Sequence, residues 1–137
     1  MEKVLVTGAT GFVGLHCIHQ LLNQGYRVNG TLRSLSRKEE IEQALAKCNT
    51  SCDNLALFEV DLLSDKGWDE AMDGCDYVLH VASPFVMKNP KSESDMIQPA
   101  VDGTLRALRA SKAAGVKRFV LTSSTVAMMG TQKSGTF

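Results

Sequence analysis

Five short aliphatic runs alternate with segments in which apolar residues recur at helical spacing, and this alternation restricts the fold more than any other feature of the sequence. The aliphatic runs occupy residues 3–8, 26–33, 55–62, 76–84 and 117–124, and the helical segments occupy residues 11–24, 36–48, 64–74 and 95–114. Strands that alternate with helices in this way are typical of a parallel sheet with helices on both faces. We therefore predict an α/β fold.

The connections between the strands narrow the topology further. Each crossover between parallel strands is expected to be right-handed, and few strand orders satisfy that rule. We expect the Rossmann-type, doubly wound order 3-2-1-4-5, numbered along the chain, with a crevice between strands 1 and 4. In this prediction the sheet is truncated after strand 5, and residues 1–137 form a single domain.

Composition excludes several classes of protein. Fifteen basic and fifteen acidic residues balance, so there is no excess of positive charge to bind nucleic acid. No apolar run approaches the roughly 20 residues that cross a membrane, and no signal-peptide pattern precedes the first strand. The four cysteines form no C-x-x-C pair, and we predict no metal site. We expect a cytoplasmic protein with no nucleic-acid or membrane partner.

A glycine-rich turn, "TGATGFVG", joins the first strand to the first helix. Gly8 permits a tight turn, Gly11 lets a pyrophosphate approach the backbone, and Gly14 lets the helix pack against the sheet. The helix N-terminus offers free N–H groups and a partial positive charge to phosphates. Because the turn follows a strand and opens a helix, it predicts a dinucleotide site. The alternative is a glycine-rich turn without a ligand.

The end of the second strand indicates which dinucleotide is bound. Enzymes that bind NAD usually place an acidic residue about 20 positions after the glycine loop, where it bonds the ribose 2′-OH. Here Arg33 stands near that position, and no acidic residue occurs between Glu2 and Glu39. A guanidinium can bond a 2′-phosphate with two hydrogen bonds, so the sequence favours NADP(H). Arg37 or Lys38 adds a second positive charge in this prediction, and a solvated arginine at a loop tip is the alternative.

The second helix carries a start signal of its own. Ser36 is placed to cap it, with Glu39 three residues later as the partner in a capping box. We expect the helix to begin at this pair.

Five stretches together resemble one protein family. They are "TGATGFVG", "DLLSD" after the third strand, "HVASPF" after the fourth, "VDGTLRALRAS" in the fourth helix and "RFVLTSS" at the fifth strand. They are similar to the extended short-chain dehydrogenases/reductases of the NAD-dependent epimerase/dehydratase superfamily. "HVASPF" resembles most specifically the branch of dihydroflavonol 4-reductases, cinnamoyl-CoA reductases and aldehyde/ketone reductases. The resemblance covers the whole chain and matches only the N-terminal part of such proteins.

The resemblance implies an NADP(H) site and assigns residues to it. Asp61 accepts a hydrogen bond from the adenine amino group beside the backbone of Leu62, although a turn or capping role for Asp61 fits the sequence as well. His80 is expected to be a packed strand residue rather than an acid or base. The other positions that the resemblance gives to the cofactor are Thr10, Phe12, Val13, Val81, Ala82, Ser83, Thr122 and Ser123.

The same resemblance implies a catalytic serine. Family members reduce a carbonyl by hydride transfer from the nicotinamide and use a Ser or Thr, a Tyr and a Lys. Ser124 matches the serine, and an ordinary strand-end serine is the alternative. The Tyr and Lys belong to a Y-x-x-x-K element on one helix, but Tyr26 and Tyr77 are followed four residues later by glycine and valine. In the family this element lies beyond the position of Phe137, with the last strands and the substrate domain.

These observations leave three hypotheses. The first is the NADP(H)-binding portion of an oxidoreductase that reduces an aldehyde, a ketone or a dihydroflavonol-like carbonyl, with no significant turnover by these residues alone. The second is a non-catalytic dinucleotide-binding or sensor module. The third, a fragment of a nucleotide-sugar epimerase or dehydratase, normally prefers NAD and is disfavoured by Arg33 and "HVASPF". The fifth strand would lie at an exposed, apolar edge of the sheet, which favours association. We therefore expect a homo-oligomer, or a complex with a partner, formed through this strand and the helix 95–114.

Overall fold

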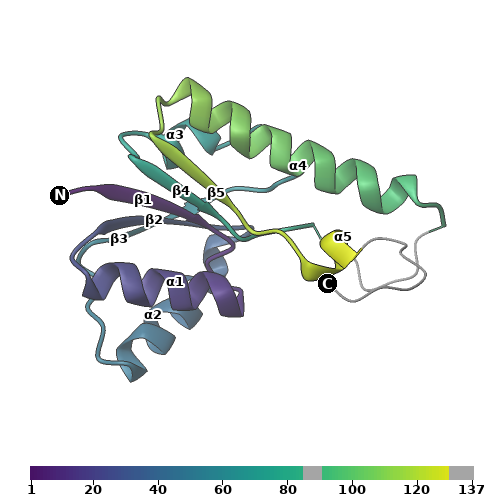
Figure 1. Ribbon diagram of the computed structural model, residues 1–137. Coiled ribbons are helices and arrows are strands. Elements are labelled where there is room, and N and C mark those ends of the chain that lie inside the picture. The colour runs from purple at the N-terminus through teal and green to yellow at the C-terminus, as the bar shows by residue number, and fades with distance from the viewer. Residues whose placement is uncertain (85–90, 130–137) are drawn as a thin grey trace.

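A computed structural model describes residues 1–84 and 91–129 (Figure 1). These residues form one parallel sheet in the order β3-β2-β1-β4-β5, which confirms the predicted Rossmann-type order. The strands are β1 (Lys3–Thr7), β2 (Arg27–Leu32), β3 (Leu55–Glu59), β4 (Tyr77–His80) and β5 (Arg118–Leu121). Each strand is shorter than predicted, because the chain leaves the sheet at the carboxyl end of every strand and enters a loop.

Two layers of helices enclose the sheet (Figure 1). On one face lie α1 (Phe12–Asn23) and α2 (Lys38–Lys47), and on the other lie α3 (Trp68–Met72) and α4 (Ser94–Ala113). A 3-10 turn, η1 (Leu35–Arg37), precedes α2, and a short helix, α5 (Thr125–Met129), follows β5. Among the described residues, no helix combines the length and apolar character needed to cross a membrane.

The central strand β1 is buried on both faces, which explains its unbroken aliphatic sequence. Val4 and Val6 pack in the cluster that includes Ile18 of α1 and Ile41 of α2. Leu5 points to the other face and packs in the cluster with Trp68, Met72 and Ala107. The alternation of β1 side chains therefore links the two halves of the core.

The predicted start of α2 is wrong. Ser36 lies inside η1, and α2 begins at Lys38 without a side-chain cap. Instead the hydroxyl of Ser34 accepts a hydrogen bond from the Ser36 amide at 3.4 Å, so the polar cap acts on the 3-10 turn that comes first. The short α5 was also not predicted, since five residues are too few to show a helical period. Residues 130–137 lie outside the described part of the chain.

The long helix α4 has two different faces. Gly103, Ala107 and Ser111 are buried, in contact with the loop after β3, the core cluster of Leu5 and α3, respectively. Such small residues let the helix approach these neighbours closely. The opposite face exposes large apolar side chains, and they are Ile97, Val101, Leu105 and Leu108. The strand β5, at the end of the sheet order, also exposes apolar side chains, Val120 and Leu121.

The double burial of β1 generates a stability prediction. Leu5 is 0% exposed, whereas Leu63 in the loop after β3 is 58% exposed. We expect Leu5→Ala to lower the free energy of unfolding by about 2–5 kcal/mol, because it leaves a cavity in a packed core. The matched change Leu63→Ala should cost less than about 0.5 kcal/mol. Urea denaturation measures both values, and equal losses would contradict the proposed role of Leu5 in the core.

Candidate functional site

The candidate site begins at the turn between β1 and α1, where the strand order reverses. Gly8 has a φ of +76°, which favours glycine, and its carbonyl accepts a hydrogen bond from the Gly11 amide at 2.9 Å. A Cβ on Gly14 would lie 2.1 Å from the Gly8 oxygen, so no other residue fits there without a shift of the backbone. Gly8 and Gly14 together therefore fix how closely α1 approaches the end of β1.

The first turn of α1 is open to solvent. Gly11 is the N-cap residue with no side-chain cap, and a Cβ at Gly11 would meet only the Gly8 oxygen, at 3.3 Å. Phe12 is 81% and Val13 is 53% exposed, and Thr10 is half-buried. A helix N-terminus whose amides are left uncapped by side chains is suited to bind phosphate.

A threonine hydroxyl joins this turn to the loop after β4. Thr7 Oγ1 accepts hydrogen bonds from the amides of Val81, at 3.1 Å, and Ala82, at 3.0 Å. It also lies 3.0 Å from Nδ1 of His80. Because the hydroxyl oxygen already accepts two hydrogen bonds, the hydroxyl donates its own hydrogen to Nδ1. We therefore assign the proton of the neutral His80 ring to Nε2. The hydroxyl replaces the backbone partners that Val81 and Ala82 lose where the sheet ends.

His80 has a structural role, as the sequence predicted. Its ring is 2% exposed, and burial lowers the pKa of His80 below its usual value of 6.5. It lies 5.6 Å from the ring of Phe119, centroid to centroid, and so packs β4 against β5. A neutral, enclosed imidazole bonded to Thr7 is not placed to exchange protons with a substrate.

The register of the strands brings the predicted positions after β4 and β5 to the same side of the sheet as the glycine turn, where the strands end. Thr7 pairs with His80, and His80 pairs with Leu121. The residues that follow these three are therefore level with one another, and they are Gly8, Val81 and Thr122. Ala82 lies against the turn, since a Cβ on Gly8 would be 3.1 Å from the Ala82 Cβ. The Thr122 amide donates to the His80 carbonyl at 3.0 Å.

The serines near this edge are exposed. Ser83 follows Ala82, and Ser123 and Ser124 follow Thr122. The Ser124 hydroxyl accepts a hydrogen bond from the Val126 amide at 3.2 Å, so it caps the start of α5. This bond leaves the hydroxyl proton free to be donated.

A second part of the site lies at the carboxyl ends of β2 and β3. It is a hollow of about 620 Å³ whose polar lining includes Arg33, Asp61 and Lys66. Its further lining residues are Leu35, Leu57, Phe58, Glu59, Ser64, Gly67 and Glu70. Asp61 Oδ1 accepts a hydrogen bond from the Leu63 amide at 2.9 Å, so Asp61 does stabilise a turn. Leu62 follows it at the start of the loop.

The structure does not bring Lys38 to this hollow. Lys38 Nζ lies 3.4 Å from Glu42 and lines a different hollow beside Cys52. Arg37 is also engaged elsewhere, because it forms an ion pair with Glu40 at 2.7 Å. Lys66 is the basic residue that shares the lining with Arg33, and the sequence analysis missed it. The predicted adjacency of strands 2 and 3 could have indicated Lys66, since the loops that follow two neighbouring parallel strands lie on the same side of the sheet.

Both tyrosines lie away from this edge. Tyr77 is the first residue of β4, and its hydroxyl donates to Glu2 Oε1 at 2.6 Å. That hydrogen bond raises the pKa of Tyr77. Tyr26 directly precedes β2 and packs against the core. Strands begin at the opposite edge of the sheet from Gly8 and Ser124, so neither hydroxyl is available there. Among residues 1–84 and 91–129, no group of acidic, histidine or cysteine side chains could hold a metal ion.

The buried imidazole predicts a dependence of stability on pH. Because the folded-state pKa of His80 is below 6.5, the unfolded chain binds the proton first as the pH falls. The contribution of His80 to the free energy of unfolding should therefore be constant above about pH 7 and should decrease below it, by up to about 1.4 kcal/mol per pH unit. His80→Gln should remove this slope between pH 7 and 5, whereas His16→Gln, at an exposed position of α1, should keep it. Urea denaturation across this range is the measurement, and an unchanged slope in His80→Gln would refute the assignment.

Comparison with known proteins agrees with this geometry. The chain is 38% identical over 134 residues to a dihydroflavonol 4-reductase of Dianthus caryophyllus, covering 96% of this chain and 37% of that protein. It is 43% identical over 127 residues to aldehyde reductase 2 of Sporidiobolus salmonicolor, covering 92% and 36%. The chain thus spans little more than a third of these relatives.

Solved structures show the same fold. The yeast methylglyoxal/isovaleraldehyde reductase Gre2, complexed with NADPH, matches with a TM-score of 0.78 and 32% identity over 91% of this chain and 38% of its own. Vestitone reductase from alfalfa (Medicago sativa) matches with a TM-score of 0.73 and 33% identity, over 93% and 37%. The family profile described as "NAD dependent epimerase/dehydratase family" matches residues 4–136. The chain belongs to the NAD-dependent epimerase/dehydratase family.

Proposed function

We propose that residues 1–137 form the NADP(H)-binding portion of an oxidoreductase that reduces a carbonyl group to an alcohol. The observation that carries this proposal is the turn Gly8–Gly14, packed against the end of β4 and open in front of Gly11. A crevice outside the carboxyl ends of the strands, where the strand order reverses, is the usual place for a dinucleotide in such a sheet.

The residues present fit each part of the cofactor. The open first turn of α1, with Thr10, Phe12 and Val13, suits the diphosphate. Arg33 suits the 2′-phosphate, and Asp61 with the Leu62 backbone suits the adenine. The ends of β4 and β5 suit the nicotinamide and its ribose, through Val81, Ala82, Ser83, Thr122 and Ser123. When bound, the cofactor supplies the hydride.

Ser124 is the residue of this chain that would act on a substrate. Its hydroxyl is exposed beside the predicted nicotinamide position and can donate a hydrogen bond to a carbonyl oxygen. Relatives named as aldehyde reductase and dihydroflavonol 4-reductase support a carbonyl substrate. The general acid must come from outside residues 1–137, since neither tyrosine begins a Y-x-x-x-K element.

One observation favours a second candidate, a non-catalytic dinucleotide-binding module. Both tyrosines are at the edge of the sheet away from the candidate site, so the described residues supply groups that bind and orient but no group that protonates. An epimerase-type fragment with NAD is less well supported, because Arg33 occupies the place of the acidic residue. The exposed apolar side chains of α4 and β5 support the further proposal that the chain associates with itself or with a partner.

The choice of cofactor can be tested by titration. We expect NADPH to bind at least about tenfold more tightly than NADH, because hydrogen bonds to a charged group contribute roughly 1.5–3 kcal/mol. Arg33→Ala should remove most of that preference and leave NADH binding nearly unchanged. Lys38→Ala is the matched control, since Lys38 lies in another hollow. Fluorescence titration of the reduced nicotinamide measures the affinities of the three proteins for both cofactors.

Two results of that titration would change the proposal. If NADH binds the unmutated chain as tightly as NADPH, the 2′-phosphate is not recognised. If Lys38→Ala instead of Arg33→Ala weakens NADPH selectively, the second helix provides the phosphate contact, as the sequence also allowed.

Catalysis by residues 1–137 alone should be negligible. Loss of a general acid typically slows such a reaction by about 10²–10⁴-fold, and neither tyrosine of the sequence begins the Y-x-x-x-K element that would supply one. We expect NADPH oxidation with methylglyoxal or isovaleraldehyde to match the rate in a protein-free control, as followed by absorbance. A clear rate above that control, removed by Ser124→Ala, would show that these residues are sufficient for catalysis.

A further inference from the structure

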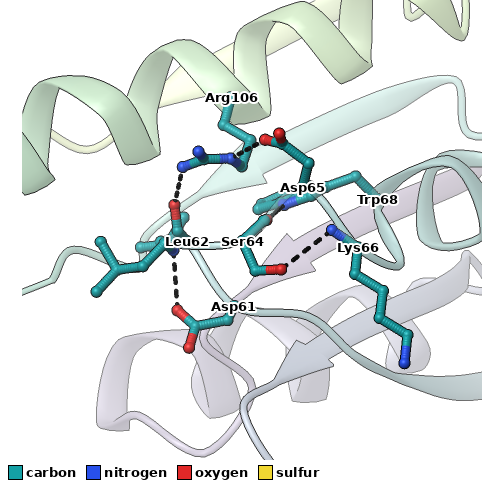
Figure 2. Close-up of polar contacts among 8 residues, drawn as sticks. Asp61, Leu62, Ser64, Asp65, Lys66, Trp68 and Arg106 are labelled. Atoms are coloured by element: carbon teal, nitrogen blue, oxygen red, sulfur yellow. Dashed lines mark hydrogen bonds and ion pairs between the residues drawn. The ribbon is translucent and has the colours of Figure 1, made fainter.

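The loop after β3 is held in place by a side chain of α4. Arg106 Nη1 donates to the carbonyl of Leu62, and its Nε donates to Asp65 Oδ1 (Figure 2). The planar guanidinium can reach both acceptors at once, which a lysine cannot do with the same geometry. One side chain therefore fixes the loop at two points.

The same face of α4 contacts Leu62 a second time. Gly103 lies three residues before Arg106, and residues at this spacing are neighbours on a helix surface. A Cβ on Gly103 would be only 3.1 Å from the Leu62 Cβ. The helix thus sets the position of Leu62 through a hydrogen bond to its carbonyl and through close packing against its side chain.

Further hydrogen bonds make the loop one connected unit. The Leu63 amide donates to Asp61 at 2.9 Å, and Trp68 Nε1 donates to the Ser64 carbonyl at 3.0 Å. The amide of Lys66 donates to the Ser64 hydroxyl at 3.3 Å (Figure 2). A displacement of Leu62 would therefore move the Asp61 carboxylate as well.

This loop separates two hollows. Asp61, Ser64 and Lys66 line the hollow that also contains Arg33. Arg106 instead lines a smaller hollow of about 310 Å³ between α3 and α4, together with Arg109. Arg106 thus contacts the loop that forms one side of the candidate adenine site, but Arg106 itself does not line that site.

The two contacts of Arg106 differ in strength. Its side chain is 22% exposed, whereas the side chain of Asp65 is 89% exposed. An ion pair with so exposed a partner is screened by water and contributes little. The hydrogen bond to the Leu62 carbonyl is part-buried, so it is the contact that determines the position of the loop.

We propose that Arg106 is a positioning residue for the cofactor, which places Leu62 and the Asp61 carboxylate where they recognise the adenine ring. This inference rests on the proposed dinucleotide function. It assigns to α4 a part in recognising the base, although α4 contributes no lining residue to the hollow that contains Arg33.

An analogue of the cofactor separates positioning from stability. Reduced nicotinamide hypoxanthine dinucleotide phosphate lacks the amino group that Asp61 would accept from. We expect the unmutated chain to bind NADPH about tenfold more tightly than this analogue, since the lost hydrogen bond involves a charged acceptor. Arg106→Met, which keeps the apolar stem, should weaken NADPH binding and bring the ratio of the two affinities close to one. A loss of stability alone would weaken the binding of both ligands equally.

Matched variants complete the experiment. Arg109 lines the same hollow as Arg106, and Arg109→Met should keep the tenfold ratio of affinities. Asp65→Asn should also keep this ratio, because the ion pair of Asp65 with Arg106 is screened by water. Gly103→Ala should lower the ratio by a steric route, so it tests the inference even if Arg106→Met does not fold. Circular dichroism checks the folding of each variant.

The outcomes for the two proposals are distinguishable. If the unmutated chain prefers NADPH over the analogue and folded Arg106→Met and Gly103→Ala keep that preference, the positioning role is wrong and cofactor binding stands. If the unmutated chain does not bind NADPH at all, the proposed function fails, and the positioning role fails with it.

Discussion

The hydroxyl of Thr7 is the interaction on which the arrangement of the site depends. The chain after β1 continues to α1 on one face of the sheet, whereas the chain after β4 continues to α4 on the other face. The backbone amides after β4 therefore lose their strand partners. The Thr7 hydroxyl accepts hydrogen bonds from the amides of Val81 and Ala82 and donates one to Nδ1 of His80. Part-buried amides without a partner would each cost free energy, so this one oxygen allows β4 to end beside Gly8.

Around that point the site is assembled from pieces that are far apart in sequence. The glycine turn is local to residues 8–14, and its geometry follows from contacts between its own residues, such as Gly8 with Gly14. The hollow beside Arg33 is different, because it combines the ends of β2 and β3 with a loop held by α4. The glycine turn and the hollow beside Arg33 therefore depend on separate structural supports.

Much of the fold could be predicted from the sequence. The strand order, the role of His80 as a packed residue and the two-sided burial of β1 followed from aliphatic runs, right-handed crossovers and the position of the glycine turn. What escaped prediction depends on side-chain direction. Lys38 and Lys66 are both lysines near strand ends, and only their three-dimensional placement separates them into different hollows. Likewise Ser34 and Ser36 are both plausible caps, and the hydroxyl that comes first in the chain acts on the earlier turn.

The link between Arg106 and Leu62 also determines when the site can form. The two residues are separated by 44 positions, and Arg106 and Asp65 by 41. During synthesis, the glycine turn obtains its contacts once β4 has formed, because Thr7 pairs with His80 and bonds the amides of Val81 and Ala82. The loop after β3, which lines the hollow beside Arg33, acquires its final shape only after residue 106 has left the ribosome and α4 has docked. A nascent chain therefore completes the glycine turn before the loop after β3 is held in place by α4.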